Sequence, residues 1–343
     1  MVSTVPSAAR VTRLLDAARP EAVAEAARLL AASSLVAFPT ETVYGLGADA
    51  SDPAAVAALY AAKGRPAFNP LIAHTADVAA ARRLGRFGPA AERLAEHFWP
   101  GPLTLVVPYI GGDGACDLAR AGLSTIGLRV PAHPAALALI SAFGGAVVAP
   151  SANRSGRVSP TTAAHVMEDL AGRIDAVLDA GPTRVGVEST ILDLTGETPV
   201  LLRPGGLARD AIAAALGHPV ASAGGGADAR PLAPGRLASH YAPRALLRLD
   251  AAEVRPGEAL LTFAGAHPPG SDSAAEILDL SPAGDLMEAA ARLYGALRAL
   301  DATGVGAICV VPLPRSGLGE AMADRLARAA APRPEPTDSE IPA

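Results

Sequence analysis

Short apolar runs alternate with alanine-rich amphipathic segments along the first two hundred residues of the chain. Residues 21–32 carry apolar side chains at helical spacing, and residues 52–62 begin with an Asp-Pro pair suited to a helix start. Further helices are expected at 90–97, 135–143 and 162–171, and strands at 35–38, 71–74, 103–108, 125–130, 146–149, 176–178, 190–194 and 200–202. Strands that alternate with helices, and then follow one another directly, predict a mixed α/β sheet with flanking helices.

A segment rich in glycine and proline separates this part from a second, smaller one. It has three consecutive glycines at 224–226 and prolines at 219, 231 and 234, the composition of a linker. Beyond it, strands are expected at 259–263, 276–279 and 306–311, and helices at 285–300 and 318–330. We therefore expect a first domain over 1–217, a linker over 218–244, a small α/β domain over 245–332 and a disordered tail over 333–343.

Composition narrows the class of protein. The chain has 343 residues, of which 50% are hydrophobic and 3% aromatic, with a net charge of -5. The apolar fraction excludes a disordered chain, and the negative charge argues against a chain built mainly to wrap nucleic acid. Cys116 and Cys309 lie far apart without metal-ligand spacing, which favours a reducing cytosol. The uncharged run 130–153 is interrupted by prolines and glycines, so we expect a cytoplasmic protein without a membrane span.

One basic residue stands out. Lysine and arginine together number 29, and Lys63 is the single lysine among them. A position that keeps lysine indicates a need for a compact, rotatable ammonium, although chance survival at a solvated site would also explain it. Arg65 follows two positions later, and Pro66 favours an extended path in which both cations face one side and form an anion site. The alternative is a solvated basic helix end.

Polar residues also gather where other expected strands end. The segment 39–47 follows the strand 35–38, and Ser151 and Asn153 follow the strand 146–149. Both sites could bind a ligand at a sheet edge, or they could be ordinary turns and caps. Further candidates beside strand ends are Arg129, Glu188, Ser189, Thr190 and Arg203. Because the sequence has no phosphate-binding glycine loop, nucleophile triad or metal-ligand run, the pattern predicts substrate positioning rather than nucleophilic catalysis.

These segments carry a resemblance to a known family. They are FPTETVYGLGADA (38–50), KGRPAFNPLIAH (63–74), WPGPLTLV (99–106), TIGLRVPAHP (125–134), PSANRSGRVSPT (150–161), ESTILD (188–193), LLRPG (201–205) and SHYAP (239–243). With them the chain resembles the threonylcarbamoyl-AMP synthase family in its long, two-domain form. The resemblance spans residues 20–243 and implies a YrdC-like catalytic domain with a twisted mixed sheet, followed by a smaller Rossmann-like domain.

The resemblance implies a nucleotidyltransferase that condenses L-threonine, bicarbonate and ATP to threonylcarbamoyl-AMP and pyrophosphate. Magnesium would accompany ATP, and the product would serve threonylcarbamoyladenosine modification of tRNA, with tRNA and proteins of that pathway as possible partners. The implied catalytic signature is Lys63, Arg65, Ser151 and Asn153; the implied threonine-binding residues are Thr42, His74, Arg129 and Ser189; and the implied ATP-binding residues are Arg65, Asn69, Asn153, Thr161, Arg203 and Tyr241. No protein metal ligand is expected.

The resemblance also suggests roles. Lys63 and Arg65 would neutralise the reacting carboxylate and the phosphates, Ser151 and Asn153 would orient phosphate or ribose, and Arg203 would hold the leaving pyrophosphate. The linker resembles a lid that carries Tyr241 over the nucleotide, although residues 236–239 are less basic than expected there.

Two other functions remain open at this stage. A different carbamoyl- or adenylate-forming transferase could use the same sheet. An RNA-binding module with a vestigial nucleotide pocket is the non-enzymatic alternative, which the acidic balance and scarce aromatic residues disfavour. The second domain could restrain the lid, contact partner proteins or stabilise the first domain.

Overall fold

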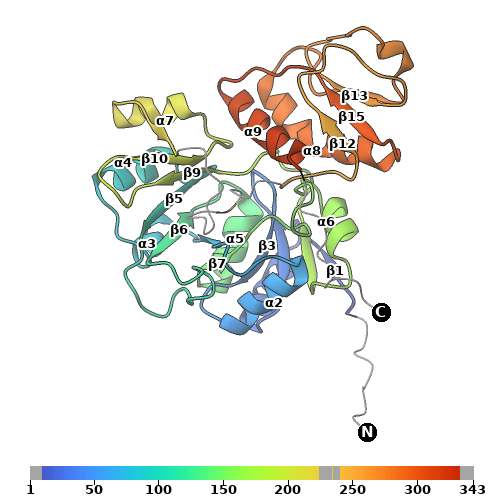
Figure 1. Ribbon diagram of the computed structural model, residues 1–343. Coiled ribbons are helices and arrows are strands. Elements are labelled where there is room, and N and C mark those ends of the chain that lie inside the picture. The colour runs from blue at the N-terminus through green and yellow to red at the C-terminus, as the bar shows by residue number, and fades with distance from the viewer. Residues whose placement is uncertain (1–9, 224–233, 235–239, 333–343) are drawn as a thin grey trace.

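The computed structural model describes residues 10–223, 234 and 240–332, which form two lobes (Figure 1). The expected tail 333–343 and the linker segments 224–233 and 235–239 lie outside the described residues. The residue boundaries expected for the domains stay predictions.

The larger lobe is built on one mixed sheet. Its eleven strands in the described chain have the order β1-β8-β2-β3-β7-β4-β6-β5-β9-β10-β11. The strands are β1 (Arg13–Asp16), β2 (Val36–Pro39), β3 (Tyr44–Asp49), β4 (Ile72–His74), β5 (Leu103–Pro108), β6 (Thr125–Arg129), β7 (Val147–Val148), β8 (Ala176–Asp179), β9 (Thr190–Asp193), β10 (Val200–Arg203) and β11 (Ala221–Ser222). The sheet contains parallel pairs such as β4 with β6 and antiparallel pairs such as β5 with β6, which confirms the expected mixed sheet.

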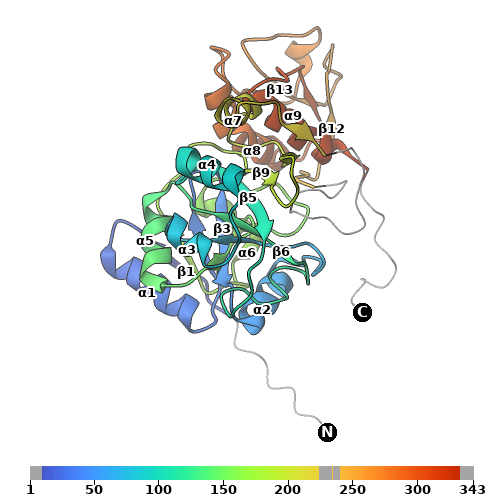
Figure 2. The same ribbon diagram turned by 90° about the vertical axis from the view of Figure 1, so that its left-hand side faces the viewer.

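Helices cover this sheet. They are α1 (Pro20–Ala31), α2 (Pro53–Lys63), α3 (Val78–Arg82), α4 (Pro89–Phe98), α5 (Pro134–Phe143), α6 (Ala163–Leu170) and α7 (Arg209–Leu216). Helices α1 and α5 lie side by side on one face, where they enclose a core with β2, β7 and β8 (Figure 2). Helix α2 begins as expected, because the side chain of Asp52 accepts a hydrogen bond from the amide of Ala54.

Within residues 240–332, the smaller lobe has a parallel sheet of four strands in the order β12-β15-β13-β14. The strands are β12 (Leu246–Arg248), β13 (Ala259–Thr262), β14 (Ile277–Asp279) and β15 (Ala307–Val310), and the helices are α8 (Leu286–Ala302) and α9 (Leu318–Ala330), with a short 3₁₀ turn at Ser271–Ser273. This is the expected Rossmann-like arrangement. Helices α8 and α9 face the larger lobe, so they can contact its loops directly (Figure 1).

The segment 39–47 differs from its expected form. Only residues 40–43 form a turn, and Tyr44–Asp49 continues as β3, antiparallel to β2. Gly45 and Gly47 weaken the strand signal of this segment in the sequence. Close packing around position 47 requires a glycine there. A Cβ at Gly47 would lie 2.8 Å from the Phe38 ring and 2.9 Å from the carbonyl oxygen of Val36.

Six other elements of the described residues were not predicted from the hydrophobic pattern: β1, α3, α7, β11, β12 and the 3₁₀ turn. All are short, and the strands β1 and β12 lie at sheet edges, where exposed positions weaken the apolar signal.

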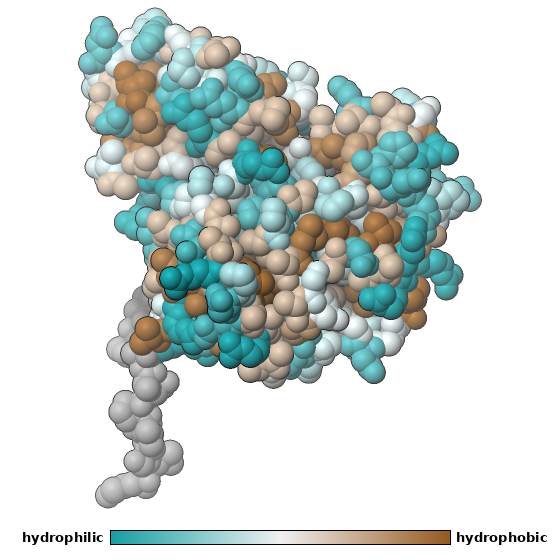
Figure 3. All heavy atoms as spheres, turned by 180° about the vertical axis from the view of Figure 1, so that it is seen from behind, coloured by the Kyte–Doolittle hydropathy of each residue, from teal (hydrophilic) through white to brown (hydrophobic). Residues whose placement is uncertain are grey.

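In the described residues, every helix is too short or too polar to span a membrane. On the face opposite that of Figure 1, hydrophobic residues reach the surface in small patches among hydrophilic ones (Figure 3).

Candidate active site

The polar segments singled out in the sequence converge on one pocket, which is lined by the larger lobe and by Pro234, His240 and Tyr241. Most of the expected site residues line it, namely Thr42, Arg65, His74, Arg129, Ser151, Ser189, Arg203 and Tyr241. Glu188 and His240 also line it. Lys63, Asn69, Asn153 and Thr161 do not.

One end of the pocket is organised around Arg129. This residue ends β6 and pairs in register with His74, which ends the parallel neighbour β4. Its guanidinium Nη2 lies 2.7 Å from Oε1 of Glu41 and 3.0 Å from Oγ1 of Thr42, and its Nε donates to the carbonyl of Gly101. Because the Arg129 and Glu41 side chains are only 5% and 3% exposed, this is a buried ion pair beside the hydroxyl of Thr42.

Ser189 and Arg203 form the adjoining wall. The Ser189 hydroxyl lies 2.8 Å from the hydroxyl of Thr104. Arg203 donates from Nε and Nη2 to the carbonyl oxygen of Ser189 at 3.1 Å and 2.8 Å. Gly205 permits this approach, since a Cβ there would lie 2.4 Å from the carbonyl oxygen of Glu188.

Lys63 lies behind the pocket wall rather than in it. Its Nζ donates to the backbone carbonyls of Ser151 and Asn153, both at 2.5 Å. The side chain is 2% exposed, so the alternative of a solvated helix end is wrong. The expected extended path is also wrong, because Lys63 is the last residue of α2 and Gly64 turns the chain at a φ of 59°.

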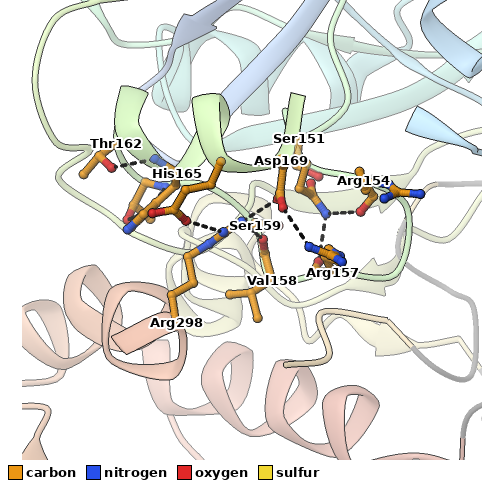
Figure 4. A network of polar contacts seen from close by, with 12 residues as sticks. Ser151, Arg154, Arg157, Val158, Ser159, Thr162, His165, Asp169 and Arg298 are labelled. Carbon is orange, nitrogen blue, oxygen red and sulfur yellow. Dashed lines mark hydrogen bonds and ion pairs between the residues drawn. The ribbon is translucent and has the colours of Figure 1, made fainter. Parts of the chain in front are cut away.

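Asn153 holds the loop that follows. Its Nδ2 donates to the carbonyls of Arg154 and Arg157 at 2.8 Å each. The NH₂ group of this amide therefore stabilises a turn, which is the structural alternative to ligand binding. Figure 4 shows the loop continuing into a charged network, in which Asp169 binds both Arg157 and Arg298 of α8. The amide oxygen Oδ1 of Asn153 is buried without a hydrogen bond in the described structure.

Asn69 and Thr161 differ in their surroundings. Asn69 is buried close to Arg65, and neither atom of its side-chain amide has a partner among the described residues. Such atoms are costly unless a ligand or water satisfies them. Thr161 instead lies beside His165 just before α6, away from the pocket lining.

Three buried cations dominate the electrostatics of the site. Lys63, Arg65 and Arg203 are 2%, 9% and 4% exposed, and within the described chain none forms an ion pair with a carboxylate. Burial lowers the pKa of Lys63 well below its usual value and that of Arg65 to about 10. Because buried positive charge is unfavourable without a counter-charge, this arrangement favours an anionic ligand.

Two buried histidines predict a loss of stability in mild acid. Burial, with Arg129 beside His74 and Arg65 beside His240, lowers the pKa of each imidazole from 6.5 to about 3. The unfolded chain therefore binds more protons than the folded one between these values, so stability falls as the pH drops below 6.5. From pH 7 to pH 5 each histidine should cost about 2 kcal/mol of unfolding free energy.

Denaturant titration of His74→Gln at both pH values tests this prediction. The drop in unfolding free energy should be smaller than in the wild type by about 2 kcal/mol. His97→Gln, at an exposed position of α4, is the matched control and should keep the full drop. Equal drops in wild type and His74→Gln would contradict a neutral buried imidazole.

The resemblance implies magnesium, whose ligands in proteins are mainly carboxylate oxygens. In the described residues no group of three or more His, Cys, Asp or Glu side chains could hold a metal ion. Glu41 is bound by Arg129 and the amide of Ala132, and Glu188 by Arg325 and Tyr294. These side chains do not form a protein magnesium site.

Some residues of the site were missed or lacked a role in the sequence analysis. Thr104 and His240 lie within motifs that carry the family resemblance (99–106 and 239–243). The sequence therefore marked their segments but not their individual contacts. Tyr294 and Arg325 reach Glu188 from 106 and 137 positions away, and no local pattern marks them.

Comparison with known proteins agrees with this geometry. Residues 28–205 match the Sua5/YciO/YrdC family model, described as telomere recombination, and residues 207–331 match threonylcarbamoyl-AMP synthase, C-terminal domain. Threonylcarbamoyl-AMP synthase of Bacillus subtilis is 43% identical over 329 residues, covering 91% of this chain and 93% of the relative. That of Pyrococcus abyssi is 44% identical over 321 residues, covering 89% and 92%.

A solved structure gives the same result. The crystal structure of P. abyssi Sua5 complexed with L-threonine matches with a TM-score of 0.85 and 39% identity, over 93% of this chain and 97% of that one. The chain therefore belongs to the threonylcarbamoyl-AMP synthase family.

Proposed function

We propose that the pocket binds L-threonine, bicarbonate and ATP together and converts them to threonylcarbamoyl-AMP and pyrophosphate. The observation that carries this proposal is the pair of buried cations that line the pocket, Arg65 and Arg203, neither of which has a carboxylate partner in the described structure. Lys63 adds a buried basic group behind the pocket wall. ATP and a carboxylated amino acid are both anionic and repel each other, so fixed positive charge is needed to hold them in one site.

Threonine would bind at the end organised by Arg129. Its carboxylate suits the guanidinium, and its hydroxyl suits the side chains of Thr42, His74 and Ser189. The P. abyssi relative has been solved with L-threonine, which supports threonine as a ligand of this chain.

ATP would occupy the end formed by Arg65, Arg203, Tyr241 and His240. The unpartnered amide of Asn69 lies close to Arg65 and offers hydrogen bonds to ribose or phosphate. The unpartnered Oδ1 of Asn153 can accept a further hydrogen bond, while Thr161 does not line the pocket. Tyr241 lines this end, and an aromatic side chain is suited to contact a nucleotide.

The reaction needs positioning and charge stabilisation rather than a covalent enzyme intermediate. The threonine amine adds to bicarbonate with loss of water and gives a carbamate, whose oxygen attacks the α-phosphorus of ATP. The bond from that phosphorus to the bridging oxygen breaks, and pyrophosphate leaves with its electron pair. Arg65 and Arg203 would stabilise the negative charge on the phosphates, and Lys63 would hold Ser151 and Asn153 in place through their carbonyls.

Magnesium would supply further charge neutralisation on the ATP phosphates, carried by the nucleotide rather than by a protein carboxylate cluster. We further propose that the enzyme acts in the cytoplasm and that its product is passed on for threonylcarbamoyladenosine modification of tRNA. Direct contact with tRNA or with proteins of that pathway is part of this proposal.

Pyrophosphate release by the full chain tests the function. Release should require ATP, bicarbonate and threonine together, and serine should not replace threonine. A thermal-shift series should show a larger stabilisation by ATP with threonine than the sum of the two alone, since both occupy one pocket. Tight, salt-dependent RNA binding without turnover would favour the RNA-binding module instead, and release with other amino acids would favour a different transferase.

A further inference from the structure

The carboxylate of Glu188 is held mainly by the C-terminal domain. It is buried in the larger lobe, one residue before Ser189, and accepts a hydrogen bond from Ser159 at 2.6 Å. The remaining donors come from the other lobe. Tyr294 of α8 donates its hydroxyl at 2.9 Å, and Nε of Arg325 of α9 lies 2.7 Å away.

Arg325 also contacts a second segment beside the pocket. Its guanidinium is 1% exposed and donates from Nη2 to the carbonyl of Pro204 at 3.0 Å. It thereby connects residue 188 with residue 204, which flank the contact between Ser189 and Arg203. Burial alone would raise the pKa of Glu188, but Arg325 and Arg203 together lower it to about 2, so the carboxylate is ionised at neutral pH.

The same two side chains enclose Tyr241. Its ring centroid lies 5.1 Å from the guanidinium carbon of Arg325 and 6.0 Å from the ring of Tyr294, which is nearly parallel to it at 20°. Tyr241 is 2% exposed and has a φ of 64°, an unfavourable backbone conformation for tyrosine that its surroundings must maintain. Glu188, Ser189 and Tyr241 line the pocket, whereas Tyr294 and Arg325 do not.

We propose that Tyr294 and Arg325 are positioning residues for the reaction: through Glu188 and Tyr241 they fix the wall shared by the two halves of the pocket. The inference rests on the proposed function and deepens it, because it gives the C-terminal domain a part in catalysis beyond stabilising the fold. Ser189 belongs to the proposed threonine end and Tyr241 to the nucleotide end. Loss of the contact should therefore weaken the use of both substrates.

Tyr294→Phe is the most direct test, since it removes one hydroxyl and keeps the ring stacked on Tyr241. We expect folding to be retained, KM to rise for both threonine and ATP, and kcat/KM to fall about tenfold, because small displacements of positioned groups are amplified in rate. The greater stabilisation by ATP and threonine together should also diminish.

A pair of double variants separates positioning from stability. Arg325→Met with Glu188→Gln removes a buried ion pair between the lobes without leaving either charge unpaired. Arg209→Met with Glu320→Gln removes a half-exposed pair between the same lobes and is the matched control. The first should lose about 10- to 100-fold in kcat/KM at a melting temperature that still shows a folded protein, and the control should stay close to wild type.

Three outcomes would overturn the proposal. Wild-type kinetics in Tyr294→Phe would do so whatever the double variant shows, because Glu188 itself could then account for that loss. Equal losses in the two double variants would indicate a general displacement of the lobes. A kcat/KM equal to that of the wild type in Arg325→Met with Glu188→Gln would show that the pair serves stability alone. An inactive wild type would instead refute the proposed function, so the two failures remain distinguishable.

Discussion

Lys63→Arg is expected to slow threonine-dependent pyrophosphate release. The activation barrier should rise by about 2–4 kcal/mol, the range for loss of one preorganised contact. The ammonium of Lys63 fits between two carbonyl oxygens, each 2.5 Å from a single nitrogen. A planar guanidinium needs more room and directs its donors differently, so it would displace Ser151 and Asn153. Steady-state kinetics should show most of the effect in kcat.

Two further variants sharpen this prediction. Lys63→Met should lose activity and also stability, about 1–3 kcal/mol, because it leaves both carbonyls buried without a donor. Arg154→Lys, at an exposed position of the same loop, should behave like the wild type. Full activity in Lys63→Arg would refute the claim that this position requires lysine.

The sequence predicted most of the fold because the buried elements have strong periodicity. The helix at 318–330 and the strand at 103–108 have their expected bounds, and most other expected elements differ by one or two residues at an end. β3 was missed because Gly45 and Gly47 reduce its strand signal. Both glycines pack closely against other segments of the chain. A Cβ at Gly45, for example, would lie 3.0 Å from that of Ala149. Such requirements arise only in the folded chain.

The site was predictable as a set of motifs but not as a geometry. The single lysine identified Lys63 as unusual, yet its direction depends on the left-handed turn at Gly64 and on carbonyls 88 and 90 positions away. The contacts of Glu188 with Tyr294 and Arg325 depend on the docking of two lobes. Local propensity carries no information about such docking, and a single arginine or tyrosine on a helix resembles any other.

Arg129→Met is expected to destabilise the enzyme by about 3–5 kcal/mol, because it leaves the Glu41 carboxylate buried without its cation. The pair is 2.7 Å apart and almost fully shielded from water. The exposed pair Arg82–Glu92 provides the matched control, since Arg82→Met should leave the unfolding free energy close to that of the wild type. Denaturant unfolding measures both values, and equal stability losses would contradict the difference in burial.

The double variant Arg129→Met with Glu41→Gln separates stability from threonine binding. It removes both buried charges, and the carbonyl of glutamine can still accept the amide of Ala132 that Glu41 now binds at 3.0 Å. We therefore expect much of the lost stability to return. Threonine should no longer raise the melting temperature, while ATP should still do so, because the proposed threonine carboxylate site loses its guanidinium. A normal threonine shift in this variant would place the amino acid elsewhere in the pocket and refute the role assigned to Arg129.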